Sequence, residues 1–378
     1  MRVFTFISGE GATWSIAQRI VSEGHRAVVY INNPENRRAG DGLIEKSRVS
    51  SRLVTHNHFD PETLKQILEV KPDCIIVDGV DSGYGKLVEY LKSHDYTVFG
   101  GGEWSSLVNT DSAYGMRVVK MMGLPIGNSK STGVKIATGA WYNGSDVVSV
   151  FHVMDEKTLM EGGIGPKTRC MGSVVWSGST HSKLYAEGMS KLIPVLKNVG
   201  FKGQVVLGQV IDDGKLKAIS LTVQIDYNSI YPLLEMYKGR INDLFYGIAS
   251  GVLTYMEYKS EWGIGVNISV LPYPMQTEPE MMKDVEIKGL NKYNLKHIWF
   301  YDVYKPKNKY LCSGNGGSIG VITARGDRVD NWSPIRDCKR RAHRTISNIS
   351  VEDMMYRRDI GDRVRNEFDK LTQMGWLT

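Results

Sequence analysis

Residues 155–178 read DEKTLMEGGIGPKTRCMGSVVWSG and follow an apolar run, residues 147–154, that is typical of a buried strand. At the centre of the segment, residues 165–172 combine glycines, a proline and a base beside a hydroxyl. Glycine and proline favour irregular backbone, so this composition predicts a loop that offers N–H groups and short side chains to a ligand. A plain surface turn between two strands is the alternative.

The segment resembles the signature loop of glycinamide ribonucleotide synthetase, or phosphoribosylamine–glycine ligase, a family of ATP-grasp enzymes. In that family the pattern reads roughly D-H-K-R, followed by G-P-N-T-G-G-M-G. Arg169 and Cys170 stand where the family has glycines. The residues that match the family pattern are Asp155, Lys157, Gly165, Pro166, Thr168, Met171 and Gly172.

The bulk composition bounds the class of protein. The chain has 378 residues, enough for two or three domains of about 100–200 residues each. Hydrophobic residues make up 42% and charged residues 23%, as in an ordinary globular protein in water. With no run of about 18 apolar residues and a strand directly after Met1, we expect neither a membrane span nor a secretory signal. The four cysteines form no C-x-x-C pair, which favours reduced thiols and a cytoplasmic location.

Strand and helix patterns alternate through the first hundred residues, which predicts an α/β fold with a mostly parallel, doubly wound sheet. The first predicted strand, residues 3–7, ends at the turn Gly9-Glu10-Gly11, which leads through Thr13 into a helix. Backbone N–H groups in such a turn can hold a phosphate. The third glycine of the dinucleotide fingerprint is missing, so a tight turn without a ligand is the alternative.

The resemblance implies three parts along the chain. A doubly wound N-terminal domain would occupy residues 1–105, and a degenerate ATP-grasp core without its lid would occupy residues 106–285. A small, β-rich and basic C-terminal domain would occupy residues 286–378, where residues 313–317 look like the family's glycine hairpin. In the same domain, residues 356–361, YRRDIG, match the family's Y-R-x-D-I-G motif.

The parts of the family that hold ATP look lost. The family's lid, with a nucleotide-binding lysine, follows a G-I-P turn, but here residues 123–125 lead almost directly to the strand at 147–151. A second lysine of the family falls at Ser112, and its magnesium ligands fall at Ser220 and Thr222. Magnesium prefers anionic oxygens, so we expect no cofactor, neither ATP nor nucleotide-bound magnesium, and we assign no metal ligand. Whether a divalent ion accompanies the pyrophosphate stays open.

Loss of ATP activation with a retained substrate frame points to an acceptor that is already activated. Amino acid:DNA transferases of bacterial viruses, which look like relatives of this ligase, displace a pyrophosphate from the 5-methyl group of a modified thymine. The chain resembles that group. The resemblance implies an ATP-independent transferase, acting in the cytoplasm of an infected bacterium, that joins glycine or serine to pyrophosphorylated 5-hydroxymethyluracil in DNA. Its partners would be DNA with a modified pyrimidine and a free amino acid.

This reaction needs cations and N–H donors for the pyrophosphate, and a base for the attacking amine. The candidate bases are Asp155, Asp226 and His152. Cys170, beside Arg169, is a candidate thiolate nucleophile, although a small residue in place of glycine is the simpler interpretation. The remaining substrate frame is assigned to the Gly9–Thr13 turn, the matched loop residues, Lys157, Lys167, Arg169, Asn228, Asn315, Gly316, Gly317 and Arg358.

Positive charge is concentrated near the C-terminus, where residues 305–344 hold ten Lys and Arg against three Asp. A solvated helix face is the common meaning of such a run, and a phosphate-rich partner is the functional one. The DNA contacts would come from Lys305, Lys307, Arg336, Lys339, Arg340, Arg341 and Arg344. One or two of Trp299, Tyr301, Tyr304 and Trp332 would stack on an extruded base, the others being core.

Two other functions remain open from the sequence. The first is a true ligase of purine synthesis that holds ATP in a reduced site. The second is an inactive ATP-grasp relative that binds nucleic acid or serves as a scaffold. Retention of Asp155, Lys157 and Arg358 speaks against the scaffold, since a scaffold has no need of a cationic substrate loop.

Overall fold

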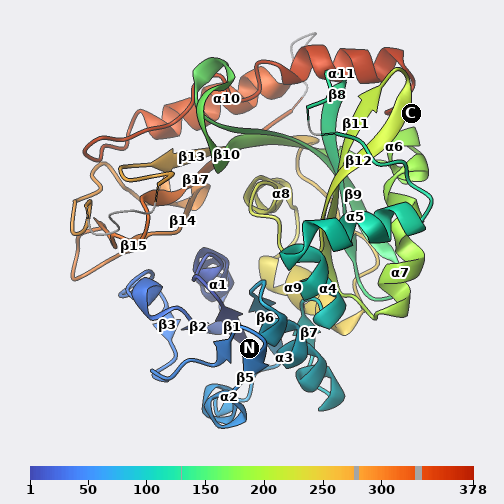
Figure 1. The fold of residues 1–378 in the computed structure, drawn as a ribbon. Coiled ribbons are helices and arrows are strands. Elements are labelled where there is room, and N and C mark those ends of the chain that lie inside the picture. Colours follow the sequence, from blue (N-terminus) through green and yellow to red (C-terminus); the bar gives the residue numbers. More distant parts are fainter. Residues whose placement is uncertain (129, 276–280, 328–333) are drawn as a thin grey trace.

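The computed structural model describes residues 1–128, 130–275, 281–327 and 334–378. A parallel sheet of five strands forms the N-terminal part, and a sheet of eight strands forms most of the remainder (Figure 1). Helix α8 (Ile230–Met236) lies between the two sheets, whereas α10 (Pro334–Ile346) and α11 (Val364–Gln373) cover the far side of the large sheet.

The parallel sheet confirms the predicted α/β arrangement. Its strand order is β3-β2-β1-β6-β7, and every neighbouring pair is parallel. Strands β2 and β3 are added on one side of β1, and β6 and β7 are added on the other side. In parallel α/β sheets, ligands usually bind at the carboxyl ends of the strands where the order changes side in this way, here β1 and β6. The elements are β1 (Val3–Ser8), α1 (Trp14–Ser22), β2 (Arg26–Ile31), β3 (Glu45–Lys46), α2 (Pro61–Leu68), β6 (Cys74–Asp78), α3 (Ser82–Ser93) and β7 (Val98–Phe99).

The large sheet is antiparallel, in the order β12-β11-β8-β9-β10-β13-β17-β14. It joins strands from both sides of the domain boundary expected at residues 285 and 286. Its strands are β8 (Val134–Tyr142), β9 (Val147–Met160), β10 (Ile164–Gly178), β11 (Gly203–Asp212), β12 (Lys215–Thr222), β13 (Trp262–Ser269), β14 (Ile298–Phe300) and β17 (Ser318–Gly326). Helix α5 (Ser112–Met121) packs on β12, α4 (Glu103–Thr110) lies between α3 and α5, and α9 (Ile241–Ser250) packs on β6 and β7 of the parallel sheet. Helices α8 and α10 both pack on β13 and β17.

The prediction of a loop at residues 165–172 is wrong. These residues belong to β10, which forms a long hairpin with β9 through a turn at Glu161–Gly163. The pairing shifts register between Ile164 and Lys167 and again before Gly172, so bulges absorb the irregular composition. From Gly172 onward β10 also pairs with β13, whereas the part before it pairs with β9 alone. We call residues 155–171 the hairpin arm.

Apolar residues recur with a helical period through residues 184–196, but the chain does not form one helix there, because it bends at Gly188. The segment forms α6 (Lys183–Glu187), a 3₁₀ turn at Met189–Leu192 and α7 (Ile193–Asn198). A Cβ atom at Gly188 would lie 2.1 Å from Nε2 of Gln209 on β11. The apolar residues of the segment therefore still face the core, and the bend at Gly188 lets the chain pack closely against β11.

Candidate active site

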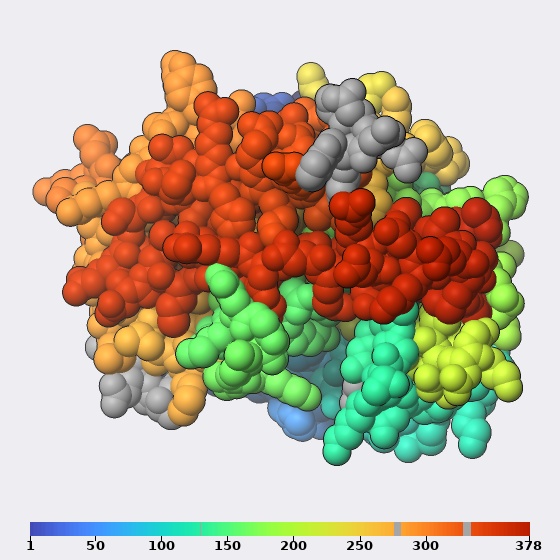
Figure 2. All heavy atoms as spheres, turned by 90° about the horizontal axis from the view of Figure 1, so that it is seen from above, coloured from blue at the N-terminus to red at the C-terminus, as the bar shows by residue number. Residues whose placement is uncertain are grey.

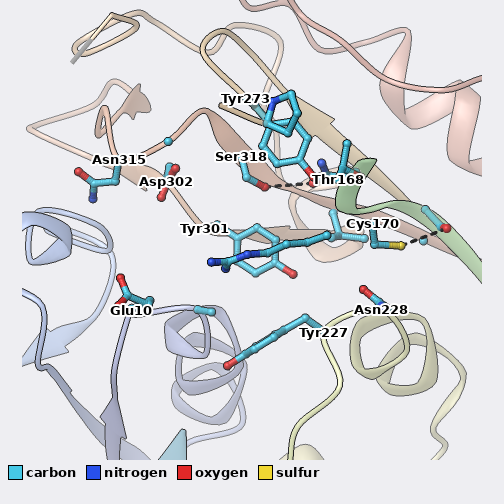
Figure 3. Close-up of a pocket in the computed structure, with 18 of the residues that line it drawn as sticks. Glu10, Thr168, Cys170, Tyr227, Asn228, Tyr273, Tyr301, Asp302, Asn315 and Ser318 are labelled. Carbon is cyan, nitrogen blue, oxygen red and sulfur yellow. Dashed lines mark hydrogen bonds between the residues drawn. The ribbon is translucent and has the colours of Figure 1, made fainter. Parts of the chain in front are cut away.

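One cavity of about 420 Å³ lies between the turn after β1 and the strands β10, β13 and β17 (Figure 3). This volume suits a small-molecule ligand. Segments far apart in the sequence meet here, and they are the segments that the sequence assigned to the substrate frame. The predicted residues that line the cavity are Glu10, Gly11, Lys167, Thr168, Arg169, Cys170, Gly172, Asn228, Asn315 and Gly316.

The glycine turn offers less to a phosphate than the sequence indicated. The N–H group of Gly9 donates to the carbonyl of Asp78 at 2.7 Å, and that of Gly11 donates to Ser8 Oγ at 2.9 Å. The hydroxyl of Thr13 donates to the Asp78 carboxylate at 3.2 Å. These groups of the turn therefore serve the fold rather than the cavity.

The turn presents a carboxylate to the cavity instead. Oε2 of Glu10 accepts hydrogen bonds from the side-chain amides of Asn33, at 3.0 Å, and Asn36, at 2.5 Å. Two donors hold the side chain in place without cancelling its charge. A fixed anion of this kind favours a cationic group, such as the ammonium of an amino acid, over a phosphate.

Asp78, at the end of β6, anchors one wall of the cavity. Its carboxylate accepts from Ser8 at 2.8 Å, from Thr13, and from the hydroxyl of Tyr227, a cavity residue. Burial raises the pKa of Asp78, and these three donors oppose the rise. The network fixes the ring of Tyr227 against the parallel sheet. No sequence motif indicated this network, because its members come from separate segments.

Asp302 is a cavity residue that no motif indicated, and its surroundings shift its pKa toward neutral pH. Burial raises the pKa of Asp302 to about 7, although N–H groups of Ser318 and Gly317 and the nearby Arg169 lower it. A base titrating near neutral pH is well matched to proton transfer. Asp302 comes shortly after β14, and its environment is built by residues from other parts of the chain.

Opposite charges are thus arranged around one space. Figure 3 shows Glu10, Asp302 and Asn315 on one side of the cavity, and Cys170 and Asn228 on the other. Lys167 and Arg169 of the hairpin arm add two cations to the lining. The Nδ2 atom of Asn315 is enclosed but has no hydrogen-bond partner within the described ranges, so it is a donor available to a ligand.

The environment of Cys170 holds its thiol in the protonated form. Burial raises the pKa of Cys170 well above its ordinary range, and the nearby Asp155 raises it further. The thiol also donates to the carbonyl of Gly172 at 3.2 Å. A protonated, hydrogen-bonded thiol is a poor nucleophile, and the nucleophilic role of Cys170 stays a prediction without structural support.

Beside the cavity, Asp155, Lys157, Asp226 and Asn228 form a polar cluster. Nζ of Lys157 lies 3.2 Å from Oδ2 of Asp155, which chiefly raises the pKa of Lys157, and Nδ2 of Asn228 donates to the same oxygen at 3.2 Å. Burial raises the pKa of Asp226, whose carboxylate accepts from Ser229 Oγ at 2.7 Å. Of these four residues, only Asn228 lines the cavity. Lys157 is paired with Asp155 and does not reach the cavity lining.

Other predicted residues lie elsewhere. Met171 is fully buried in the core, and Gly317, whose N–H group bonds to the Asp302 carboxylate, is not among the lining residues. His152 is 2% exposed and contacts Thr138 Oγ1 at 3.1 Å through Nδ1. Burial lowers the pKa of His152 to about 3, which keeps the ring neutral inside the sheet. Gly165 and Pro166 are exposed on the hairpin arm, outside the cavity lining.

The YRRDIG motif holds the hairpin arm, and its buried arginine is Arg357 rather than Arg358. Arg357 pairs with the carboxylate of Asp359 at 2.8 and 2.7 Å, lies 3.5 Å from Glu156, and donates to both oxygens of Thr158. Figure 2 shows the arm, in green, beside the red C-terminal segment. The side chain of Arg358 is exposed and does not line the cavity.

Close packing explains why the signature has a glycine at position 172. A Cβ atom there would lie 2.6 Å from the carbonyl oxygen of Gly265 on β13 and 2.8 Å from Cγ1 of Ile360. We expect Gly172→Ala to lower the free energy of unfolding by about 1–3 kcal/mol, since β10 must move away from its neighbours. Urea denaturation measures this loss. An alanine variant as stable as the parent protein would contradict the close fit.

Three tyrosines give the cavity aromatic walls: Tyr227, Tyr273 and Tyr301. The rings of Tyr227 and Tyr301 meet edge to face, with centroids 6.4 Å apart. Among the aromatics assigned to DNA, Trp299 and Tyr304 are buried in the core, whereas Tyr301 reaches the cavity. Trp332 lies outside the described residues.

The basic residues assigned to DNA have varied surroundings. Arg340 and Arg341 pair with Asp337 at 2.7 and 2.8 Å, and Lys339 pairs with Asp362. The ammonium of Lys305 lies 4.7 Å from the ring centroid of Tyr310. Arg336, Lys307 and Arg344 are exposed. Several of these charges are thus partly balanced by nearby carboxylates.

The comparisons with known proteins agree with the resemblance. No family model matches the chain. A phosphoribosylamine–glycine ligase of Caldanaerobacter subterraneus subsp. tengcongensis is 25% identical over 371 residues, covering 93% of this chain and 83% of the relative. One from Neisseria meningitidis serogroup A is 24% identical over 233 residues, covering 59% and 53%. The homologues are ligases.

Solved structures agree at the level of the fold. The phosphoribosylamine–glycine ligase of Thermotoga maritima superposes with a TM-score of 0.68 and 19% identity, covering 95% of this chain and all of that one. The N5-carboxyaminoimidazole ribonucleotide synthetase of the same organism gives a TM-score of 0.54 at 12% identity, covering 93% and 99%. The mixed α/β fold is therefore similar to that of these ATP-grasp-type enzymes, whereas the absence of a lid stays a prediction.

Two features are absent from the described residues. No group of three or more His, Cys, Asp or Glu side chains in those ranges could hold a metal ion. None of the helices in the described part of the chain has the length and apolar character needed to cross a bilayer.

Proposed function

We propose that the chain is an ATP-independent transferase that joins the amine of an amino acid, glycine or serine, to pyrophosphorylated 5-hydroxymethyluracil in DNA. The carrying observation is the cavity in which the cations Lys167 and Arg169 meet the carboxylates Glu10 and Asp302. An amino acid brings one charge of each sign, and a pyrophosphate brings several negative charges. A ligand pocket with both signs suits this pair of substrates.

The assignments follow from charge and geometry. Glu10 attracts the ammonium group of the amino acid, while Lys167 and Arg169 neutralise the pyrophosphate. The tyrosine walls suit a flat pyrimidine ring that has been turned out of the DNA stack. The free amide donor of Asn315 suits an oxygen of either substrate.

The chemical step balances without ATP. Asp302 accepts a proton from the ammonium group, and the freed amine nitrogen attacks the methylene carbon attached to C5 of the uracil. A C–N bond forms as the C–O bond to the pyrophosphate breaks, and the electron pair of that bond leaves with the pyrophosphate. Lys167 and Arg169 stabilise the charge on the leaving group.

Two features of the described residues support a reaction without ATP. Residues 122–133 connect α5 to β8, and the described residues of this connection, 122–128 and 130–133, form no helix or strand. Ser112 begins α5, and Ser220 and Thr222 lie on β12, where the resemblance expects a lysine and two metal ligands. These hydroxyls are weak ligands for a magnesium nucleotide, which supports a reaction without ATP.

The test is product analysis. We expect the protein, incubated without ATP with DNA that carries pyrophosphorylated 5-hydroxymethyluracil and a mixture of amino acids, to yield a nucleoside heavier by one amino acid. Mass spectrometry of the digested DNA detects it and names the amino acid. DNA with unphosphorylated 5-hydroxymethyluracil is the control and should stay unchanged. If the digested pyrophosphorylated DNA contained no nucleoside with an added amino acid, the proposal would be overturned.

The second candidate function is that of the homologues, phosphoribosylamine–glycine ligase. It is favoured by the similarity that covers 93% of this chain. Formation of product only from phosphoribosylamine, glycine and ATP would establish it in place of the transferase.

A further inference from the structure

A second cavity, of about 630 Å³, lies away from the candidate active site, where the 3₁₀ turn Leu295–His297 meets β17 and α10. It shares no lining residue with the first cavity. Its cations come from all three elements, and we call it the basic groove. They are Lys296, Arg325, Arg341 and Arg344.

The positive charge of the groove is largely unbalanced. Lys296, Arg325 and Arg344 make no ion pair within the described ranges, whereas Arg341 pairs with Asp337 at 2.8 Å. Arg325 is oriented by a hydrogen bond from Nη1 to Ser260 Oγ at 3.2 Å. Unpaired cations brought together from separate elements repel each other, and they are stabilised by an anionic ligand.

The single carboxylate of the groove does not cancel this charge. Glu235 is 9% exposed, and its oxygens accept from His297 Nδ1 at 2.9 Å and from Thr323 Oγ1 at 3.0 Å. Arg19, whose pKa is lowered by burial and raised by Glu235, offers a compensating positive charge nearby. The charge of Glu235 is therefore already compensated by these partners and does little to neutralise the cations of the groove.

An aromatic ring stands at the rim. Tyr293 is 68% exposed, and the ammonium of Lys292 lies 5.1 Å from its ring centroid. An exposed tyrosine beside a groove lined by cations matches the arrangement that holds single-stranded nucleic acid, in which bases stack on rings while cations follow the phosphates. An acidic peptide would match the charges but leave the ring without a flat partner.

We propose that the basic groove binds the phosphate backbone of a nucleic acid strand, with Tyr293 as a stacking platform for one base. The site extends the DNA contacts beyond those expected from sequence, through Lys296, Arg325 and Tyr293. It does not depend on the transfer chemistry, since the backbone of unmodified DNA carries the same phosphates.

The test uses the full chain and a fluorescently labelled, unmodified oligothymidylate, with affinity measured by anisotropy over a range of salt concentrations. For the double variant Lys296→Ala, Arg344→Ala we expect about tenfold weaker binding and a salt slope lower by about 0.7 for each cation removed. Tyr293→Ala should weaken binding about tenfold with the salt slope unchanged. The control Lys120→Ala, Lys197→Ala removes the same charge from exposed positions on α5 and α7, and should change affinity less than twofold.

Circular dichroism and thermal melting establish that each variant is folded. Equal losses in the groove variant and in the control would mean that total charge alone attracts DNA, and would overturn the proposal. Unchanged affinity in the groove variant would overturn it as well. Stronger competition by polyglutamate than by unlabelled oligothymidylate would assign the groove to an acidic protein instead. Because the DNA carries no pyrophosphate, each of these outcomes is separate from failure of the proposed transferase.

Discussion

Replacement of Asp302 by asparagine is expected to lower the rate of amino acid transfer by about 10²- to 10⁴-fold, the usual contribution of a general base. Burial raises the pKa of Asp302 to about 7. The carboxylate is therefore protonated and inactive below this pH, and activity should rise as the pH passes through 7. Asparagine cannot accept the proton, so the residual rate of Asp302→Asn should not show this rise. Initial rates of pyrophosphate release from pH 5.5 to 8.5 (about three pH units around that pKa) measure both effects.

Two further variants separate catalysis from structure. Asp302→Glu keeps a carboxylate and should retain the rise of activity with pH at a reduced rate. Asp353→Asn alters an exposed aspartate that is not among the lining residues of the cavity, and it should match the parent protein. A parent-like pH profile in Asp302→Asn would show that another group removes the proton.

Replacement of Arg357 by alanine is expected to lower the free energy of unfolding by about 3–5 kcal/mol. Arg357 is 2% exposed, and its loss leaves the partly buried Asp359 without its arginine partner, while Glu156 keeps only Arg363. Thr158 on β9 loses a hydrogen-bond donor as well. Urea denaturation gives the stability, and hydrogen exchange should show faster opening of the hairpin arm.

The neighbouring arginine supplies a matched control. Arg358→Ala removes the same charge from an exposed side chain and should change stability by less than about 0.5 kcal/mol. Similar losses from both variants would show that the net charge of the motif matters, rather than the buried pairing of Arg357.

Much of the fold could be predicted because local patterns carry it. The apolar runs of β1, β2 and β6 and the helices between them follow periodicity, and the parallel sheet follows from their alternation. The hairpin arm could not be predicted in this way. Its glycines and proline are typical of a loop, and only pairing with β9 across two bulges makes it a strand.

The candidate site also has residues that could be predicted from the sequence and residues that could not. Sequence motifs indicated Glu10, Arg169 and Asn315, and the fold brings all three to one cavity. The motifs could not indicate Asp302, whose raised pKa depends on burial by distant segments. The Y-R-x-D-I-G motif has its fixed arginine at Arg357, but the sequence-based prediction assigned the neighbouring Arg358 to the substrate frame. Which of two adjacent arginines faces inward is decided by tertiary packing against the hairpin arm. The domain boundaries at residues 105 and 285 stay predictions.

The most direct test of the central claim is phosphorus NMR of one mixture that holds the protein, ATP, glycine, serine, phosphoribosylamine and DNA with pyrophosphorylated 5-hydroxymethyluracil. Transfer without ATP predicts the appearance of pyrophosphate while the ATP signals stay constant. Conversion of ATP to ADP and phosphate, with the pyrophosphate on the DNA left intact, would contradict the account and assign the chain to ligase chemistry.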